Sequence, residues 1–379
     1  MLVRKAVKSN CRTGECILCG KPLTGIATCL ELCPACVRER PGECIPQIEM
    51  VHAQSREMFG LPAREVRSPG GIACNLCHAG CRLLEGQKGY CGVRTGDRKS
   101  MRTDGRSRAR VSYYYDPLPT NCVADWVCPG GTGAGFPKFS NDSGPEVGFY
   151  NLAVFFEACN FNCLFCQNWC FRKGQLCSPN DWSSLDTIEN AVKPDTSCIC
   201  FFGGDPGPQL PFALRLSKLA RKKEAEKILR ICWETNCAMN PVWLKKMVDI
   251  SLVSGGCIKV DLKAWDPGTH RALCGCDNKL VLENFKRIAD RALNRPDPPL
   301  LVASTPIVPG YINEEEIWGL ASFIAGINPD IPYTLLAFAP QFFMDDSPTT
   351  STEHAAACLE VARNAGLRRV HLGNIHLLC

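Results

Sequence analysis

Short apolar runs alternate with helical patterns along the chain from about residue 147 onward. Most of these runs are near-continuous, as expected for strands of a parallel sheet that helices cover on its faces. Strands are predicted at 147–156, 197–204, 228–234, 257–265, 300–308, 333–340 and 368–373. Helices are predicted near 209–227, 241–252, 279–294, 313–326 and 352–366.

Repeated β–α units of this kind predict an α/β protein built on a partial, open parallel (β/α)6 barrel. We assign this barrel to residues 146–379, and we expect its chemistry in the loops that follow the carboxyl ends of the strands. Residues 46–145 form a cysteine-containing connector with Pro/Gly-rich segments such as CPGGTGAGFPKFS, for which we expect largely irregular backbone. Residues 1–45 are cysteine-dense and poor in apolar periodicity, which predicts a small zinc-ribbon-like module.

Composition narrows the class of protein. The chain has 379 residues, 45% hydrophobic and 21% charged, as is ordinary for a globular protein. No run approaches the ~18–20 apolar residues of a membrane span, and the start lacks a signal-peptide core, so we expect a cytoplasmic protein without a membrane partner. A net charge of +5 is too small to argue for nucleic-acid binding.

The 27 cysteines are the anomaly. A disulfide framework is typical of short secreted chains, and this chain is neither short nor evidently secreted. Several cysteines form C-x2-C pairs, a spacing that suits zinc or iron–sulfur ligation. We therefore expect reduced, metal-binding thiols.

The stretch EACNFNCLFCQNW places Cys159, Cys163 and Cys166 in the loop after the first predicted barrel strand. Thiolates are soft ligands that suit zinc and iron–sulfur clusters. Three of them leave one iron of a [4Fe–4S] cube open, so that a small molecule can bind it. Cys170 lies four residues further on, and as a fourth ligand it would give a closed electron-transfer cluster instead.

This C-x3-C-x2-C loop resembles the radical S-adenosylmethionine (SAM) superfamily, and the resemblance extends over 147–379. FFGGDP at 201–206 resembles the family's Gly-Gly-Glu motif, with Asp205 in place of Glu. WETNC at 233–237 resembles the Glu-Thr-Asn-Gly stretch of the activase branch, with Cys237 in place of Gly. VDLK at 260–263 resembles the Asp-x-Lys strand end of glycyl-radical-enzyme activases.

Within the superfamily, residues 74–379 look most similar to pyruvate formate-lyase activating enzyme-like proteins, including those of the AmmeMemoRadiSam type. The resemblance implies a [4Fe–4S] cluster on the three cysteines and reductive cleavage of SAM to methionine and a 5′-deoxyadenosyl radical, which abstracts hydrogen from a substrate. A reduced flavodoxin or ferredoxin would supply the electron. The residues that the resemblance assigns to SAM are Gly203, Gly204, Asp205, Glu234, Asn236, Asp261 and Lys263.

The resemblance implies an activase-like modification of a protein, the installation of a glycyl radical. Modification of a different protein, an RNA or a small molecule remains an alternative within the radical enzymes. A non-catalytic iron–sulfur electron-transfer protein is the alternative from another class.

Two further cysteine groups carry metal-ligand spacing. Cys16-x2-Cys19-x13-Cys33-x2-Cys36 matches the four-thiolate zinc pattern, and we expect a structural zinc there. The four cysteines at positions 74, 77, 81 and 91 would hold zinc or a second iron–sulfur cluster, with free buried thiols as the alternative. For Cys122 and Cys128, metal ligation and packing in the core both remain open as roles.

A basic stretch runs through the connector. It is either a solvated surface or a docking face for an acidic electron donor. Its members are Arg94, Arg98, Lys99, Arg102, Arg106, Arg108 and Arg110.

Overall fold

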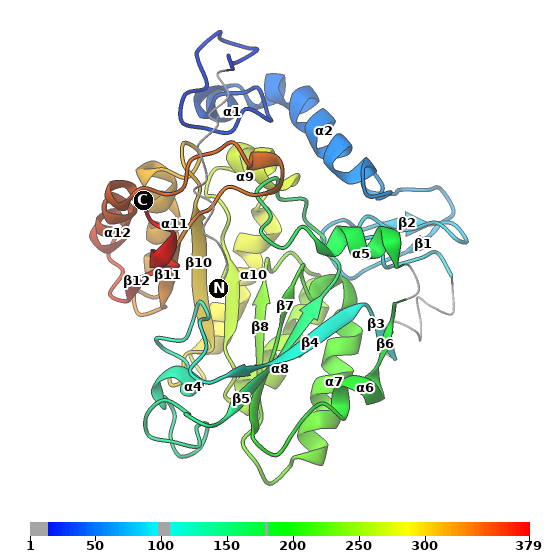
Figure 1. The fold of residues 1–379 in the computed structure, drawn as a ribbon, viewed down its shortest axis with the longest axis vertical. Helices are drawn as coiled ribbons and strands as arrows, with labels where there is room; N and C mark the ends of the chain where they lie inside the picture. Colours follow the sequence, from blue (N-terminus) through cyan, green and yellow to red (C-terminus); the bar gives the residue numbers. More distant parts are fainter. Residues whose placement is uncertain (1–13, 98–106, 179–180) are drawn as a thin grey trace, which may run out of the picture.

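The computed structural model describes residues 14–97, 107–178 and 181–379. A parallel sheet in sequential strand order forms the body of the molecule, with helices packed around it (Figure 1). Its order is β12-β11-β10-β9-β8-β7-β5-β4, and every neighbouring pair except β4–β5 is parallel. The parallel strands are β5 (Tyr150–Phe156), β7 (Thr196–Gly203), β8 (Arg230–Thr235), β9 (Ile258–Asp261), β10 (Leu301–Ile307), β11 (Tyr333–Ala337) and β12 (Val370–Gly373).

Each of the seven predicted strands is confirmed, and so is each of the five predicted helices. These helices connect successive strands, which is the right-handed β–α repeat of a parallel barrel. The sheet begins at β4 and ends at β12, so the described hydrogen bonds leave it open. The predicted helices are α7 (Leu210–Lys223), α8 (Pro241–Ser254), α10 (Lys279–Ala292), α11 (Glu314–Ile327) and α12 (Thr352–Asn364).

Several elements were not predicted. Strand β4 (Val111–Pro117) pairs antiparallel with β5 and forms the sheet edge, where most of its side chains stay partly exposed. Helix α2 (Pro41–Glu57) contains Pro46 and begins beside α1 (Pro34–Glu39). The remaining short elements are β1 (Ile72–Ala73), β2 (Arg82–Leu83), β3 (Arg108–Ala109), α4 (Pro129–Thr132), α5 (Phe171–Cys177), β6 (Ser183–Ser184), α6 (Leu185–Glu189) and α9 (Pro267–Cys274).

The N-terminal segment lies against the barrel on the side where the strands end. In Figure 1 the blue helix α1 lies above α9, which follows β9, and the two helices are in contact. The side chain of Thr28 donates a 2.6 Å hydrogen bond to Asp346, which follows β11. One buried apolar cluster contains Leu30 and Ile48 of this segment together with Leu273 of the barrel. The segment therefore shares its core with the barrel.

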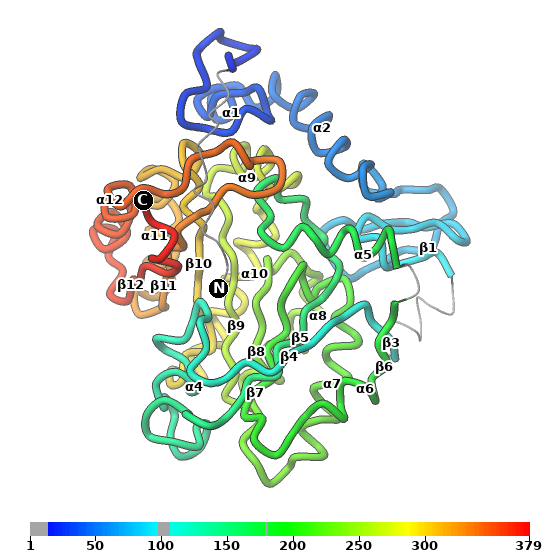
Figure 2. The backbone as a smooth tube through the Cα atoms, viewed as in Figure 1, coloured from blue at the N-terminus to red at the C-terminus, as the bar shows by residue number. Residues whose placement is uncertain are grey.

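The tube in Figure 2 follows the connector from the N-terminal helices back to the sheet edge. Helix α2 runs across the predicted domain boundary at residue 45, and the proposed division into three zones stays a prediction.

The basic stretch of the connector is only partly described. Positions 98, 99, 102 and 106 lie outside the described residues. Arg110 is buried and pairs with Glu157 at 3.2 Å, so it does not belong to a docking surface. Within the described residues, no helix is both long and apolar enough to span a bilayer.

Candidate active site and metal centres

The loop after β5 carries Cys159, Cys163 and Cys166, and the structure fixes this loop from two sides. The backbone N–H groups of Asn162 and Leu164 donate to the carbonyls of Cys274 and Leu273, at 3.0 and 2.9 Å. These acceptors lie at the end of α9. The loop is thereby held against the segment that follows β9.

Helix α2 supports the same loop through a buried polar network. Nδ1 of His52 accepts a 2.8 Å hydrogen bond from the Asn162 amide, and its Nε2 donates to the Ala272 carbonyl at 3.0 Å. Ser55 also accepts from the Asn162 amide at 2.7 Å, and Arg172 donates to the Asn162 oxygen. Burial lowers the pKa of His52 to about 4, so the ring is neutral and can act as an acceptor here.

Two glycines bring the end of β7 against the start of the cysteine loop. The backbone N–H of Gly204 donates to the Phe156 carbonyl at 2.8 Å. A Cβ on Gly204 would lie 2.3 Å from the Ala158 oxygen, and Gly203 has a φ of +110°. No other residue fits this approach. The Gly-Gly pair therefore sets the distance between the two loops.

One cavity of about 200 Å³ opens at this end of the barrel. All three loop cysteines line it, together with all seven residues that the resemblance assigned to SAM: Cys159, Cys163, Cys166, Gly203, Gly204, Asp205, Glu234, Asn236, Asp261 and Lys263. These residues come from the ends of four strands that are distant in the sequence. The fold thus brings every predicted member of the site together.

Asp205 accepts hydrogen bonds from other residues of the site. Its carboxylate accepts from the backbone N–H of Asn236 and Gly207 at 2.8 and 2.7 Å, and from the hydroxyl of Thr235 at 2.9 Å. Burial raises its pKa to about 6, in spite of these donors. Asp205 therefore ties the end of β7 to the end of β8, and it holds Asn236 at the wall of the cavity.

Two lysines of β9 and the following loop hold acidic side chains of the wall. Lys263 pairs with Asp261 at 2.7 Å, and Lys259 pairs with Glu234 at 2.9 Å. Burial opposes the charge on Lys263, but the neighbouring carboxylate outweighs it and raises the pKa of the lysine. The cavity thus has fixed charges of both signs, as recognition of a zwitterionic ligand requires.

The donor set fits a cluster with an open iron. Burial raises the pKa of Cys166 to about 11, and the pKa of Cys159 also lies well above its usual range for the same reason. The thiols are protonated before metal binds, and binding would release their protons. Cys170 is exposed and does not line the cavity. Cys274 lies 3.6 Å from Cys163 but is likewise absent from the cavity wall.

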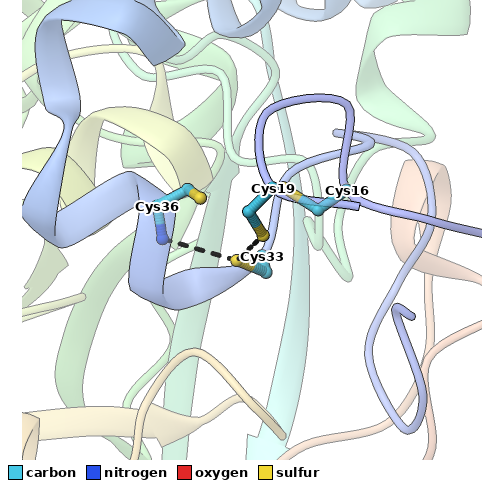
Figure 3. Close-up of side chains that lie close together, drawn as sticks. All are labelled: Cys16, Cys19, Cys33 and Cys36. Atoms are coloured by element: carbon cyan, nitrogen blue, oxygen red, sulfur yellow. Dashed lines mark hydrogen bonds between the residues drawn. The ribbon is translucent and has the colours of Figure 1, made fainter. Parts of the chain in front are cut away.

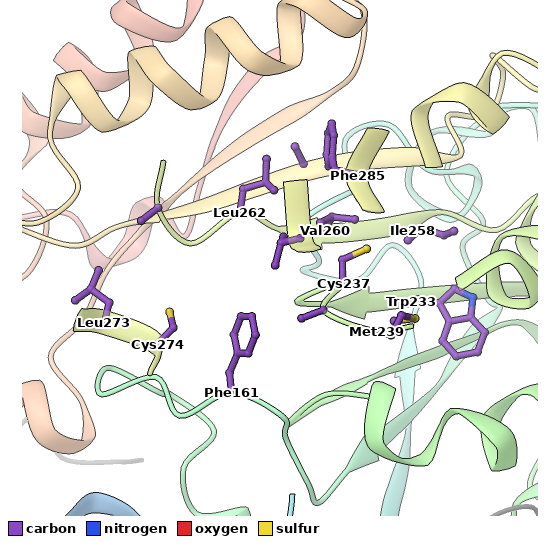
Figure 4. Packing of buried hydrophobic residues seen from close by; sticks show 14 of the residues in the cluster. Phe161, Trp233, Cys237, Met239, Ile258, Val260, Leu262, Leu273, Cys274 and Phe285 are labelled. Carbon is purple, nitrogen blue, oxygen red and sulfur yellow. The ribbon is translucent and has the colours of Figure 1, made fainter. Parts of the chain in front are cut away.

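Cys237 stands where the resembled motif has glycine. Its φ of +59° lies in the left-handed region that glycine prefers, so the backbone keeps the glycine conformation. Figure 4 shows its side chain packed among Trp233, Met239 and Val260 in the buried core. The substitution thus leaves the backbone turn of the motif unchanged.

The thiols of Cys16, Cys19, Cys33 and Cys36 converge in the N-terminal segment, as Figure 3 shows. Their four sulfur atoms all lie within 4.8 Å of one another. Tetrahedral zinc with bonds of ~2.3 Å would place its sulfur ligands about 3.8 Å apart. Burial opposes ionisation of Cys16, but backbone N–H donors led by Cys33 outweigh it and lower its pKa to about 6. The group could hold a metal ion.

The cysteines at 74, 77, 81 and 91 are arranged differently. Cys74 and Cys81 lie on the two arms of the β1–β2 hairpin, with a 2.7 Å backbone hydrogen bond from the first to the second. The hairpin turn docks beside the cysteine loop, where His78 contacts the Asn160 carbonyl at 2.8 Å. In the part of the chain that the structure describes, no three of these thiols lie within 4.8 Å of one another. Metal binding there stays a prediction.

Several residues of the cavity wall were not predicted from the sequence. Val123 comes from the connector, and Arg172 from α5. Asn374, after β12, has a φ of +56°, a turn signal that sequence alone does not distinguish from an ordinary loop asparagine. Val123 and Asn374 come from chain segments far from any motif, whereas Arg172 lies on the helix that directly follows the cysteine loop.

Comparison with known proteins matches residues 153–324 to the radical SAM superfamily. The chain therefore carries a radical SAM domain over the central part of the barrel, and the resemblance in the motifs is confirmed.

Three relatives illustrate the range of similarity. The isethionate sulfite-lyase activating enzyme of Oleidesulfovibrio alaskensis is 26% identical over 48% of this chain and 58% of its own length. The pyruvate formate-lyase-activating enzyme of Streptococcus mutans is 25% identical over 40% of this chain and, again, 58% of its own length. An uncharacterised protein of Methanocaldococcus jannaschii is 21% identical over 80% of this chain and 81% of its own. The match to the two activating enzymes thus spans a little over half of each.

Proposed function

We propose that this radical SAM enzyme cleaves SAM reductively at the 200 Å³ cavity and modifies a protein substrate, as a glycyl-radical activase does. The observation that carries the proposal is the shared cavity. Three thiols from one loop and the polar ends of three further strands line it together.

Bound there, a [4Fe–4S] cluster and SAM would supply one electron and a 5′-deoxyadenosyl radical. The thiolates of Cys159, Cys163 and Cys166 would hold the cluster. Asp205 and Gly204 would shape the place for the amino-acid end of SAM, and Asn236 would lie beside it. The charged pair of Asp261 and Lys263 would complete the opposite wall.

The similarity to activating enzymes supports a protein substrate. Two of the relatives are activating enzymes for a lyase, which is itself a protein. A flavodoxin or ferredoxin is the expected electron donor. We locate the protein in the cytoplasm, where such donors are kept reduced.

The test separates the open cluster from the closed electron-transfer cluster. Anaerobically reconstituted protein is reduced with dithionite, and 5′-deoxyadenosine is measured together with bound iron. Cys163→Ala should abolish cleavage, while Cys170→Ala, at an exposed position outside the cavity, should keep most of it. Equal loss of iron and of cleavage in Cys170→Ala would overturn the open site.

The substrate class needs its own assay. Reduced enzyme and SAM are mixed with a candidate glycyl-radical protein, and a protein-based radical is sought by electron paramagnetic resonance. A stable radical on that protein supports the activase reaction. Cleavage of SAM without any radical on protein, but with turnover of a small molecule or RNA, would favour the alternative substrates.

A further inference from the structure

A second chamber of about 120 Å³ lies in the barrel interior, beside the candidate active site. Phe202 and Glu234 line both cavities, so only one layer of side chains separates the two. Six cysteines line the second chamber: Cys122, Cys128, Cys198, Cys200, Cys232 and Cys257.

The register of the sheet explains this concentration. Cys198 and Cys200 are two residues apart on β7, so both face the barrel interior. Cys200 is paired in register with Cys232 of β8, and the carbonyl of Cys257 accepts from the next residue of β8 at 3.0 Å. Three strands thus place a row of thiols side by side.

The connector lines the chamber from the opposite side. Trp126 stacks on His371 of β12 at 5.1 Å and donates to Thr334 of β11 at 3.1 Å. These contacts anchor the connector across the open side of the barrel. Cys122 and Cys128, on either side of Trp126, therefore face the row of thiols on the strands.

A buried ammonium group completes the chamber. Lys259 is 4% exposed, and its Nζ donates to the sulfur atoms of Cys200 and Cys122 at 3.1 and 3.3 Å. Its third partner is Glu234. Such a cation stabilises negative charge that develops on nearby thiolates, and so offsets part of the cost of burying an anionic centre.

Packing alone does not account for this arrangement. A buried free cysteine can serve as a small apolar residue, as Cys358 does within α12. Protein interiors, however, are packed with few voids larger than a water molecule. Here six thiols and an ammonium group line one cavity of about 120 Å³.

The chamber thiols do not form a compact site for a single ion. Four thiolates on one zinc lie about 3.8 Å apart, a distance that the Cys16 group approaches. Among the described residues, no three thiols of the chamber lie within 4.8 Å of one another. Thiolates that bind different irons of a cluster lie farther apart than ligands of one ion.

We propose that this chamber holds an additional iron–sulfur cluster, ligated by Cys122, Cys128, Cys200 and Cys232. Cys198 already donates to Asn151 at 3.3 Å. The inference concerns cluster binding alone and does not depend on the proposed reaction.

The test begins with full-length protein in which Cys159, Cys163 and Cys166 are alanine, so that the first cluster is absent. Iron, sulfide and zinc are counted after anaerobic reconstitution. Adding Cys200→Ala and Cys232→Ala should remove at least about two irons and two sulfides per chain, the content of the smallest thiolate cluster. Cys358→Ala, a buried cysteine outside the chamber, should remove none. Cys128→Ala alone, in the connector, should give the same loss where the double variant fails to fold.

Unchanged iron and sulfide in folded chamber variants would overturn the proposal, and so would loss of zinc in place of iron. Lys259→Met provides a second readout in the same background. Removing the nearby positive charge should shift the reduction potential of the remaining cluster to a more negative value. An unchanged potential would contradict the placement of a cluster beside Lys259.

Discussion

His52 offers a test of whether helix α2 holds the candidate cluster loop. The ring is buried between the Asn162 amide and the Ala272 carbonyl, and no water-exposed side remains to accept a proton. Burial, together with the nearby positive charges of Arg56 and Arg172, lowers the pKa of His52 from 6.5 to about 4. The folded protein therefore excludes a proton that the unfolded chain binds.

The sign of the effect follows from linkage. Because the folded pKa is depressed, the contribution of His52 is fully present above pH 6.5 and is lost as the pH falls toward 4. At pH 5 the unfolded chain is largely protonated at this position, while the folded protein is not. The free energy of unfolding should then fall by about 2 kcal/mol relative to pH 7 from this group alone.

The assay compares the wild type with His52→Gln, which keeps a donor and an acceptor but does not titrate. Urea midpoints are measured at pH 7 and pH 5 by pulse proteolysis. His270 and His78 are also buried with lowered pKa values, and their contributions cancel between the two proteins. We expect the wild type to lose about 2 kcal/mol more than the variant over this interval.

An equal loss in both proteins would refute the reasoning. It would mean that His52 titrates at its ordinary pKa, so that the ring is solvated and α2 does not dock on the cysteine loop. A smaller difference with the same sign would indicate that the ring accepts its proton through local opening.

Three further predictions follow from other parts of the structure. Asp205→Ala should weaken SAM binding at least about fivefold with cluster iron intact, because three donors lose their acceptor; unchanged affinity in a titration would contradict this. Cys33→Ser should remove about one zinc per chain by metal analysis without loss of iron, whereas loss of iron would assign an iron–sulfur centre to the N-terminal segment. Glu146→Gln should destabilise the protein by about 3 kcal/mol in urea unfolding at pH 7, because Arg230 is left buried without its carboxylate; a loss near zero would show that the pair is solvated.

The sequence by itself determined the barrel. Strands such as Leu301–Ile307 are near-continuous apolar runs because both sheet faces are covered, and that pattern is local. The cysteine loop and the Gly-Gly turn could be predicted for the same reason. The spacing of the cysteines and the backbone conformation that the glycines adopt both depend on a few consecutive residues.

Elements that depend on partners distant in the sequence were not predicted from the sequence. Strand β4 has no clean alternation, and only its antiparallel pairing with β5 makes it a strand. Helix α2 carries a proline and little apolar bias, and the buried contacts of His52 and Ser55 hold it in place.

The chamber lined by six thiols shows most clearly what the sequence alone does not determine. Cys122 and Cys257 are separated by more than a hundred residues, and no spacing rule connects them. Sheet register and the anchoring of Trp126 decide that both reach one void beside Lys259. The local sequence determines which side chains of a strand point to the same face of the sheet. Only the packing of the whole tertiary structure determines which groups those side chains then contact.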